Sequence, residues 1–267
     1  MQISKYPVKS TTLSNIAEFV WHLTGDSYED INNELLPVVN TDMIINVASP
    51  IFYRFSNEPE ACAPATHIRN VKKKVQIIRQ QGPVNVWGVS LYPWGACILL
   101  KSAMCELEGQ VIDLEEYNPD FAACVPARLS SAGDDMKAAH VIEQGLETWL
   151  GSAVVTEDIF LLQDFTNNMH SQNISEFCAA RGISIKKLER LVKRYIGITP
   201  KQLQQIGRFQ KTSNQFIYNP SGAVFADLAY SHHYYDQTHF IKDFKTHSGV
   251  TPSDFLSKRD SVKEKIK

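Results

Sequence analysis

The 267-residue sequence lacks the features of several protein classes. It has no long uncharged apolar run that would cross a membrane, and its start, MQISKYPVKS, has no apolar core typical of a signal peptide. Its five cysteines are odd in number, widely spaced and without a Cys-x-x-Cys pair, which argues against a disulfide framework or a zinc site. We therefore expect a cytoplasmic protein with no membrane partner and with no metal or cofactor.

Motifs for catalysis are also lacking. Gly88–Tyr92 reads Gly-Val-Ser-Leu-Tyr and lacks the second glycine of a nucleophile elbow. His22, His67 and His140 lie far apart and do not form a metal-binding cluster, and no glycine-rich phosphate loop is present. We therefore predict no catalytic residue and no enzyme activity.

What the sequence does have is a strong charge asymmetry. Residues 1–170 carry 11 basic and 21 acidic side chains, a net charge of −10, whereas residues 171–267 carry 16 and 8, a net charge of +8, which together give −2. A basic half is typical of a segment that meets a polyanion. The alternative is a charged surface that is only solvated.

The basic half contains a predicted helix, a turn and a second helix. Ile174–Ala180 is expected as the first helix, and Gly182 suits a turn position with positive φ. Ser184 is expected to cap the second helix, Ile185–Tyr195, which ends at Gly197-Ile198-Thr199-Pro200. The pattern predicts a helix-turn-helix unit.

A second copy of this pattern follows about 52 residues later, within Ser221–Leu256. Asp236 is expected to cap a helix that carries Phe240, Ile241 and Phe244 at helical spacing. Gly249-Val250-Thr251-Pro252 ends it as the first copy ends. One departure is His233, which stands where the turn glycine would be and which tolerates positive φ at some strain.

The second copy carries a family resemblance. Tyr234–Phe255, YYDQTHFIKDFKTHSGVTPSDF, resembles the signature of the AraC/XylS family of bacterial transcription regulators, and Pro200–Gln210 is similar to that family's linker helix. The resemblance implies two helix-turn-helix units joined by a long helix, here Pro200–Tyr218, with a variable companion domain. It also implies double-stranded DNA as partner, RNA polymerase as a second partner of an activator, and a location at the nucleoid.

The resemblance further places base-reading residues on the second helix of each unit. Arg and Lys side chains can pair with guanine, and Gln with adenine. Two side chains have two interpretations: His239 reads a base or positions the backbone, and Glu189 accepts from cytosine or pairs with Lys193. The predicted DNA-binding residues are Lys186, Lys187, Arg190, Lys193, Gln237, Thr238, His239, Lys242 and Lys245.

The first half is expected to be mixed α+β and rich in strands. Thr12–Leu23 and Met136–Leu150 have helical apolar spacing, and Val154–Met169, which Thr156 can cap, would open the all-α C-terminal domain. Runs that favour strands are Leu36–Asn40, Met43–Val47, Ile51–Phe55, Val75–Arg79, Val84–Leu91 and Cys97–Lys101. We expect residues 1–150 as a sensor or association domain, 154–258 as the DNA-binding domain and 259–267 as a charged tail.

The function of the first half is open at this point. Trp87–Ala103 is similar to a segment of an N-terminal domain that accompanies some AraC-type regulators. Trp87, Tyr92 and Trp94 either line a pocket for a small-molecule effector or are core aromatic residues. The half is otherwise a module for protein interaction or homodimer formation. A DNA-repair alkyl-transfer protein is a further alternative, but it needs clustered cysteines.

Overall fold

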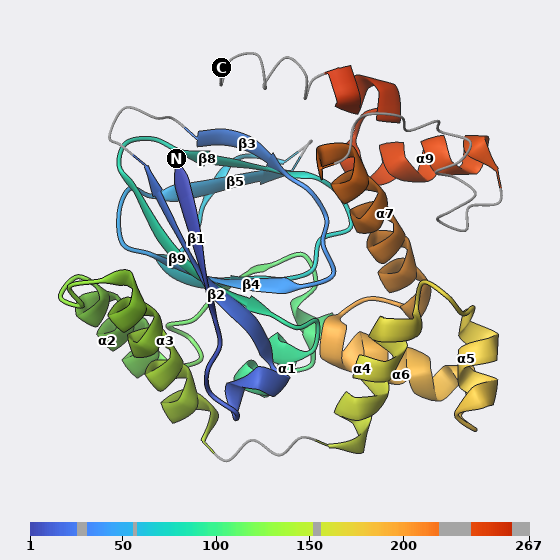
Figure 1. Ribbon diagram of the computed structural model, residues 1–267, viewed down its shortest axis with the longest axis horizontal. Coiled ribbons are helices and arrows are strands. Elements are labelled where there is room, and N and C mark those ends of the chain that lie inside the picture. Colours follow the sequence, from blue (N-terminus) through green and yellow to red (C-terminus); the bar gives the residue numbers. More distant parts are fainter. Residues whose placement is uncertain (26–30, 56–57, 152–155, 219–235, 258–267) are drawn as a thin grey trace.

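The computed structural model shows a strand-rich N-terminal region and an all-helical C-terminal region that lie side by side (Figure 1). The structure describes residues 1–25, 31–55, 58–151, 156–218 and 236–257. Within these ranges, no helix has both the length and the apolar character that crossing a membrane requires. The expected fold class, strand-rich and then all-α, is confirmed.

The N-terminal region is built from two antiparallel sheets. The six-stranded sheet has the order β1-β2-β9-β4-β7-β10, and the four-stranded sheet has the order β3-β8-β5-β6. The strands are β1 (Gln2–Pro7), β2 (Ala17–Gly25), β3 (Ile31–Leu35), β4 (Thr41–Asn46), β5 (Ile51–Phe55), β6 (Ala61–Cys62), β7 (Thr66–Arg69), β8 (Gln76–Gln80), β9 (Val84–Leu91) and β10 (Val111–Asp113).

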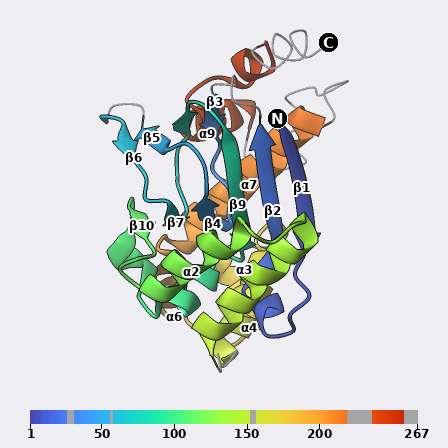
Figure 2. The same ribbon diagram turned by 90° about the vertical axis from the view of Figure 1, so that its left-hand side faces the viewer.

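One face of the six-stranded sheet is turned toward the four-stranded sheet, and helices cover its other face (Figure 2). They are η1 (Leu13–Asn15), α1 (Gly95–Leu100), η2 (Met104–Leu107), α2 (Pro119–Leu129) and α3 (Asp135–Leu150). Val20 and Val89 of the sheet pack with Ile142 and Leu146 of α3 in one buried cluster, and all four are at most 1% exposed. This burial of apolar side chains is the main stabilising contribution in the region.

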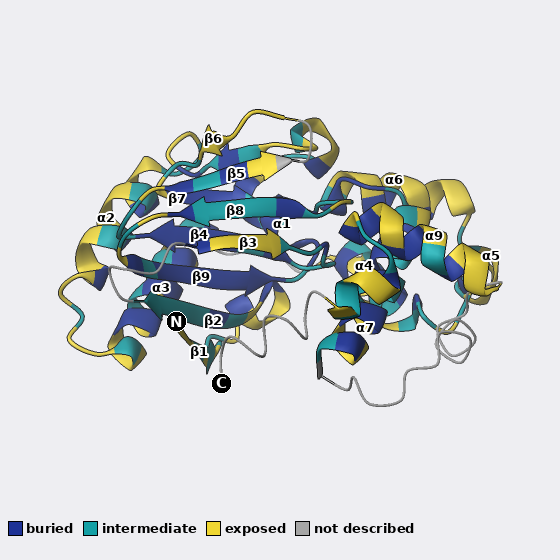
Figure 3. Ribbon diagram, turned by 90° about the horizontal axis from the view of Figure 1, so that it is seen from above, coloured by how far each residue is buried: buried dark blue, intermediate teal, exposed yellow. Residues whose placement is uncertain are grey.

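The C-terminal region consists of helices of which one side is buried and the other exposed (Figure 3). They are α4 (Glu157–Asn168), α5 (Ile174–Ala180), α6 (Ile185–Ile196), α7 (Pro200–Tyr218) and α9 (Gln237–Ser248), and residues 252–257 are also helical. The expected linker helix therefore has the predicted bounds. The predicted first helix of the second unit and His233 lie outside the described residues.

Three local predictions are wrong. Ala17–Gly25 is a strand, not part of a helix, because it pairs with β1 on one side and β9 on the other. Gly95–Leu100 is a helix rather than a strand, and four of its side chains, Ala96, Cys97, Leu99 and Leu100, are buried in the N-terminal core. Residues 36–40 form no strand. Tertiary contacts override local preference in such short apolar runs.

Candidate nucleic-acid interface

Helix α6 presents a stripe of cations. The Ser184 side chain accepts a hydrogen bond from the Lys187 amide at 3.2 Å, which satisfies one free N–H at the start of the helix. Gly182 has the expected positive φ of 61°. Leu188 and Val192 are fully buried, so the opposite side faces outward. Exposed side chains at helical spacing along that side are Lys186, Arg190 and Lys193, with Lys187 beside them.

Helix α9 repeats this construction. The Asp236 carboxylate accepts a hydrogen bond from the His239 amide at 2.7 Å, so Asp236 caps the helix, as expected. Phe240 and Phe244 are fully buried. The predicted DNA-binding residues of α9, namely Gln237, Thr238, His239, Lys242 and Lys245, are all exposed.

A shift of 52 positions superimposes the two helices residue by residue in the sequence. Lys186, Arg190 and Lys193 correspond to Thr238, Lys242 and Lys245, and the caps Ser184 and Asp236 also correspond. Each helix therefore carries a polar stripe three to four residues apart, which is the arrangement that one face of a recognition helix needs in a major groove. The sequence-predicted residues are thus brought together in two separate groups.

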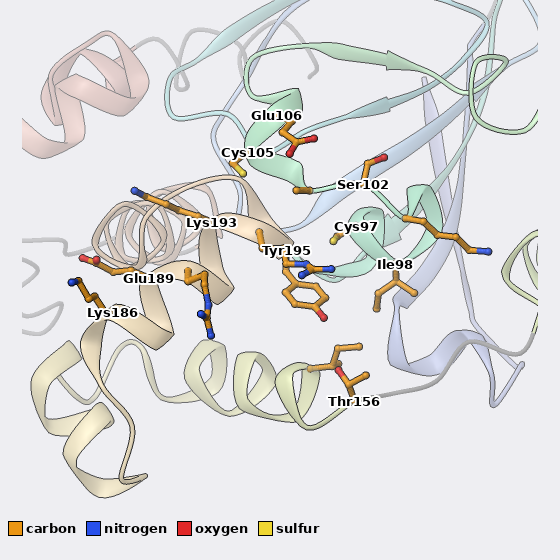
Figure 4. A pocket seen from close by; sticks show the side chains of 15 residues that line it. Cys97, Ile98, Ser102, Cys105, Glu106, Thr156, Lys186, Glu189, Lys193 and Tyr195 are labelled. Atoms are coloured by element: carbon orange, nitrogen blue, oxygen red, sulfur yellow. The ribbon is translucent and has the colours of Figure 1, made fainter.

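A cleft of about 900 Å³ borders the stripe of α6. Its other wall is formed by α1 and η2 of the N-terminal region, with Cys97, Ser102, Cys105 and Glu106 (Figure 4). Burial raises the pKa of the Cys97 thiol to about 11, so this thiol stays protonated at neutral pH. The cleft is lined by more cations than carboxylates, so its electrostatic potential favours anions. The cations are Lys101, Lys186, Arg190, Lys193 and Arg194, and the carboxylates are Glu106 and Glu189.

Lys187 lies outside this cleft, in a second hollow beside α4. The hollow also holds Asp158 and Asp164. The Arg181 guanidinium donates to Asp164 at 2.5 Å and holds the pKa of that carboxyl below its usual range. Thr156 occupies the position before α4, but its side chain makes no capping hydrogen bond.

The N-terminal region contacts the C-terminal end of α6 through apolar burial. Tyr195 packs against the N-terminal core, and Trp94 and Val71 are buried within the core of the first unit. Gly197 ends α6 with φ of +90°, and a Cβ placed there would lie 2.9 Å from the Met104 carbonyl oxygen. The two regions are therefore in close contact at this helix end.

The same region contacts the C-terminal end of α9 through hydrogen bonds. His247 Nδ1 lies 2.6 Å from the Lys73 carbonyl oxygen, and the Val75 amide donates to the His247 carbonyl at 2.8 Å. Sequence reasoning missed both Tyr195 and His247. The repeat held the signal, since these two residues occupy the same position in the two copies.

The three aromatic residues proposed for a ligand pocket lie elsewhere. Trp87 is stacked on His22 at 3.8 Å between ring centroids, within the N-terminal core. Trp94 donates its indole N–H to the Asn15 carbonyl at 2.8 Å and stacks on Tyr92. Neither the cleft beside α6 nor the cavity between the sheets is lined by any of the three.

A cavity of about 320 Å³ lies between the two sheets. It is lined mainly by apolar side chains from both sheets, among them Ile44, Ile51, Ile78 and Val86, and Gln80 lies among them. The Gln80 side-chain nitrogen donates to the Ser49 carbonyl, while its side-chain oxygen is buried and accepts no hydrogen bond within the described part of the chain. The walls of the cavity are therefore mainly apolar.

Two polar pairs line the cavity or lie beside it. Arg69 donates to Asp42 at 2.7 Å, and Tyr53 lies 3.0 Å from His67 Nε2. Burial lowers the pKa of His67 to about 4 and raises the pKa of Tyr53 to about 12, so both are neutral at pH 7. His67 Nδ1 lies 2.7 Å from the Pro64 carbonyl and must carry the proton, so Tyr53 donates its hydroxyl proton to Nε2.

A comparison with known protein families identifies a helix-turn-helix. A sequence profile of the family described as "Helix-turn-helix domain" matches residues 177–258. No curated protein matches the chain. Within the described part of the chain, no group of three or more His, Cys, Asp or Glu side chains is placed to hold a metal ion.

Similar solved structures include regulators. ToxT from Vibrio cholerae is 12% identical, with a TM-score of 0.46 over 89% of this chain and 97% of that chain. A DNA-binding transcriptional dual regulator from Escherichia coli K-12 is 17% identical over 42% of this chain and 98% of its own, with a TM-score of 0.34. The AraC-like transcriptional activator CuxR is 11% identical over 86% and 91%, with a TM-score of 0.31.

Proposed function

We propose that this chain, a DNA-binding transcription regulator of the AraC/XylS type, reads a bipartite DNA site with α6 and α9 together. In this proposal residues 154–258 are the DNA-binding domain, and the two recognition helices enter successive major grooves roughly 34 Å apart. Residues 1–150 control that binding.

The observation that supports this proposal is the pair of matching polar stripes. Both helices are capped at the N-terminus by a side chain, both bury their apolar side, and both expose side chains suited to bases and phosphates. Arg190 is suited to guanine and Gln237 to adenine. Lys193 and Lys245 stand at the third position of their stripes, further from the helix start, where phosphate contacts are expected.

The test begins with selection of bound sites from sheared genomic DNA of the source organism by the full chain. Arg190→Ala and Gln237→Ala are each expected to weaken binding to the best site by about 1–3 kcal/mol and to reduce the base preference at one position of that site. Lys137→Ala, on α3 of the N-terminal region, removes an exposed cation far from both helices and serves as the matched control for Arg190→Ala. The proposal fails if both test variants keep the affinity and the base preference of the unchanged protein.

A second part of the proposal concerns the cavity between the sheets. Its volume lies at the lower end of ligand pockets, and its mainly apolar walls, with a few charged side chains among them, suit a small apolar molecule that carries a hydroxyl or acid group. Lys5, Arg69 and Asp42 line the same cavity. Because Arg69 is paired with Asp42, the positive charge left for a ligand comes from Lys5. We propose that such a molecule is the effector, in place of one bound by Trp87, Tyr92 and Trp94.

Thermal-shift measurements on the full chain, with medium-chain carboxylic acids and substituted phenols as probes, test this part. A molecule that binds only the folded protein raises the melting temperature. Val86→Phe, which fills the cavity, is expected to abolish the shift while leaving DNA binding intact. If the probe still raises the melting temperature of Val86→Phe, the ligand binds at a site other than this cavity.

A further inference from the structure

The loop that joins β7 to β8 contacts both helix-turn-helix units. We infer that this loop, Asn70–Val75, together with His247 of α9, sets the separation of the two recognition helices and thereby the spacing of the DNA half-sites. His247 is then a positioning residue that acts on DNA through α9. The inference rests on the proposed reading of DNA by both helices, and it adds a determinant of spacing to it.

His247 joins three parts of the molecule. Its ring is 5% exposed, donates Nδ1–H to the Lys73 carbonyl and packs against Phe209 of α7 with 5.2 Å between centroids. Its other nitrogen lies 3.7 Å from an Asp243 carboxylate oxygen. The Val75 amide returns a hydrogen bond to the His247 carbonyl. Reciprocal bonds of this kind fix both the position and the angle of the helix end.

The other end of the loop is fixed to the first unit. Val71 is 6% exposed and belongs to the buried cluster that also contains Leu188 and Val192 of α6. Five residues of chain, Val71–Val75, therefore run from the core of the first unit to the last turn of α9. Any shift of the loop would move one recognition helix relative to the other.

The loop is also fastened to the segment that follows η2. The side-chain Nδ2 of Asn70 donates to the Leu107 carbonyl at 3.3 Å, and Lys72 Nζ donates to the Gly109 carbonyl at 3.0 Å. Lys73 forms an ion pair with Glu108. Met104, at the start of η2, touches Gly197 at the end of α6. The loop and η2 thus form one bonded platform under both recognition helices.

The two copies meet the N-terminal region at corresponding positions. Tyr195 corresponds to His247, and Gly197 corresponds to Gly249. A Cβ placed at Gly249 would lie 3.5 Å from a Val75 methyl carbon, which is van der Waals contact. Because α6 and α9 dock on the N-terminal region through the same two positions, the distance and angle between their polar stripes are fixed. A fixed relation is what a bipartite site with one allowed spacing requires, because an added base pair both lengthens and rotates the duplex.

The experiment uses the best selected site and versions of it in which the spacer between half-sites is one base pair shorter or longer. The unchanged protein is expected to lose about tenfold in affinity for either altered spacer, equivalent to about 1.4 kcal/mol. His247→Ala is expected to reduce that loss to about threefold or less, because α9 gains freedom to follow the displaced half-site.

Two variants separate positioning from simple damage. Thr246→Ala changes an exposed neighbour whose hydroxyl donates to the Lys242 carbonyl within the same helix, and is expected to behave like the unchanged protein. His247→Asn keeps a donor near the position of Nδ1 and is expected to restore most of the spacing preference. Hydrogen exchange should show faster exchange in residues 71–76 of His247→Ala than in the unchanged protein, with β9 unaffected.

The outcomes are distinguishable. If the unchanged protein binds no bipartite site, the proposed two-helix reading fails whatever His247 does. If it binds one spacing strictly and His247→Ala keeps that strictness, the inference about His247 is overturned while the proposed function stands. Faster exchange in β9 of His247→Ala would also overturn the inference, since the residue would then support the general fold.

Discussion

The two recognition helices are copies in layout but differ in how they are held. The first unit has a large, mainly aliphatic core that includes Val71 and Trp94 of the N-terminal region. Within the described residues, the core of the second unit contains four phenylalanines, Phe209, Phe216, Phe240 and Phe244, and the partly buried Leu36 of the N-terminal region packs against them. At corresponding positions, buried Leu191 in α6 is replaced by buried Asp243 in α9, and Tyr195 is replaced by His247.

This difference shows that one docking geometry can be held by two kinds of interaction. Apolar burial at α6 is strong and tolerant of small shifts, because it has no preferred direction. Hydrogen bonds at α9 are weaker in net terms but fix direction. The first unit is therefore expected to stay with the N-terminal region, and the second unit to be the part that detaches.

Removal of one phenyl ring gives the largest expected effect. Phe244 is fully buried and contacts Phe209, Phe216, Phe240 and Phe255. Phe244→Ala is expected to destabilise the second unit by about 3–5 kcal/mol. Because that core is separate from the core of the first unit, a thermal melt should show an early transition for the second unit alone. A single shifted transition would show that the two units unfold as one.

Acid should weaken the region that carries the platform. His67 on β7 is neutral when buried, with its pKa lowered to about 4 from an unfolded value near 6.5. Its contribution is fully present above pH 6.5 and is lost as pH falls toward 4, by about 2–3 kcal/mol at pH 4.5. Denaturant titrations at pH 7 and 4.5 measure the loss, and His67→Gln is expected to flatten this dependence. An equal pH dependence in both proteins would contradict the assignment.

The glycines that end α6 and α9 allow a comparison of how tightly the two helix ends are packed on the N-terminal region. Gly197 and Gly249 both have positive φ, at 90° and 79°, so alanine is strained by about 1 kcal/mol at either position. At Gly197 the new methyl would also lie 2.9 Å from the Met104 carbonyl oxygen, whereas at Gly249 it would meet a Val75 methyl at 3.5 Å. We expect Gly197→Ala to cost about 2–3 kcal/mol in total. Equal destabilisation in chemical denaturation would mean that the docking of the two ends is equally loose.

The helix caps give the smallest expected effect. Ser184 and Asp236 accept hydrogen bonds from the amides of Lys187 and His239. Ser184→Ala and Asp236→Ala are each expected to cost about 1 kcal/mol. Since α9 is docked on the N-terminal region by hydrogen bonds and α6 by apolar burial, the same loss should increase hydrogen exchange more in α9 than in α6. The reverse order would show that α9 is the better supported helix.

The sequence predicts the C-terminal region better than the N-terminal one. Ile174–Ala180 and Pro200–Tyr218 have the predicted bounds, because caps, turn glycines and helical spacing are local signals. Ala17–Gly25 and Gly95–Leu100 were assigned wrongly, because their state depends on partners far along the chain. The docking contacts of His247 also escape local reading, since its partner Lys73 lies 174 residues away. The repeat of Tyr195 and His247 was visible, but only the structure shows what they touch.

The same separation has a consequence for biosynthesis. A contact that spans 174 residues closes late, because the entropy of bringing its ends together opposes it until both partners are in place. Chains leave the ribosome from the N-terminus, so the loop Asn70–Val75 is made long before α9. The N-terminal region can therefore complete its sheets first and then act as a template on which the last recognition helix settles. A mutation that disturbs the folding of the N-terminal strands would therefore also disturb the docking of α9.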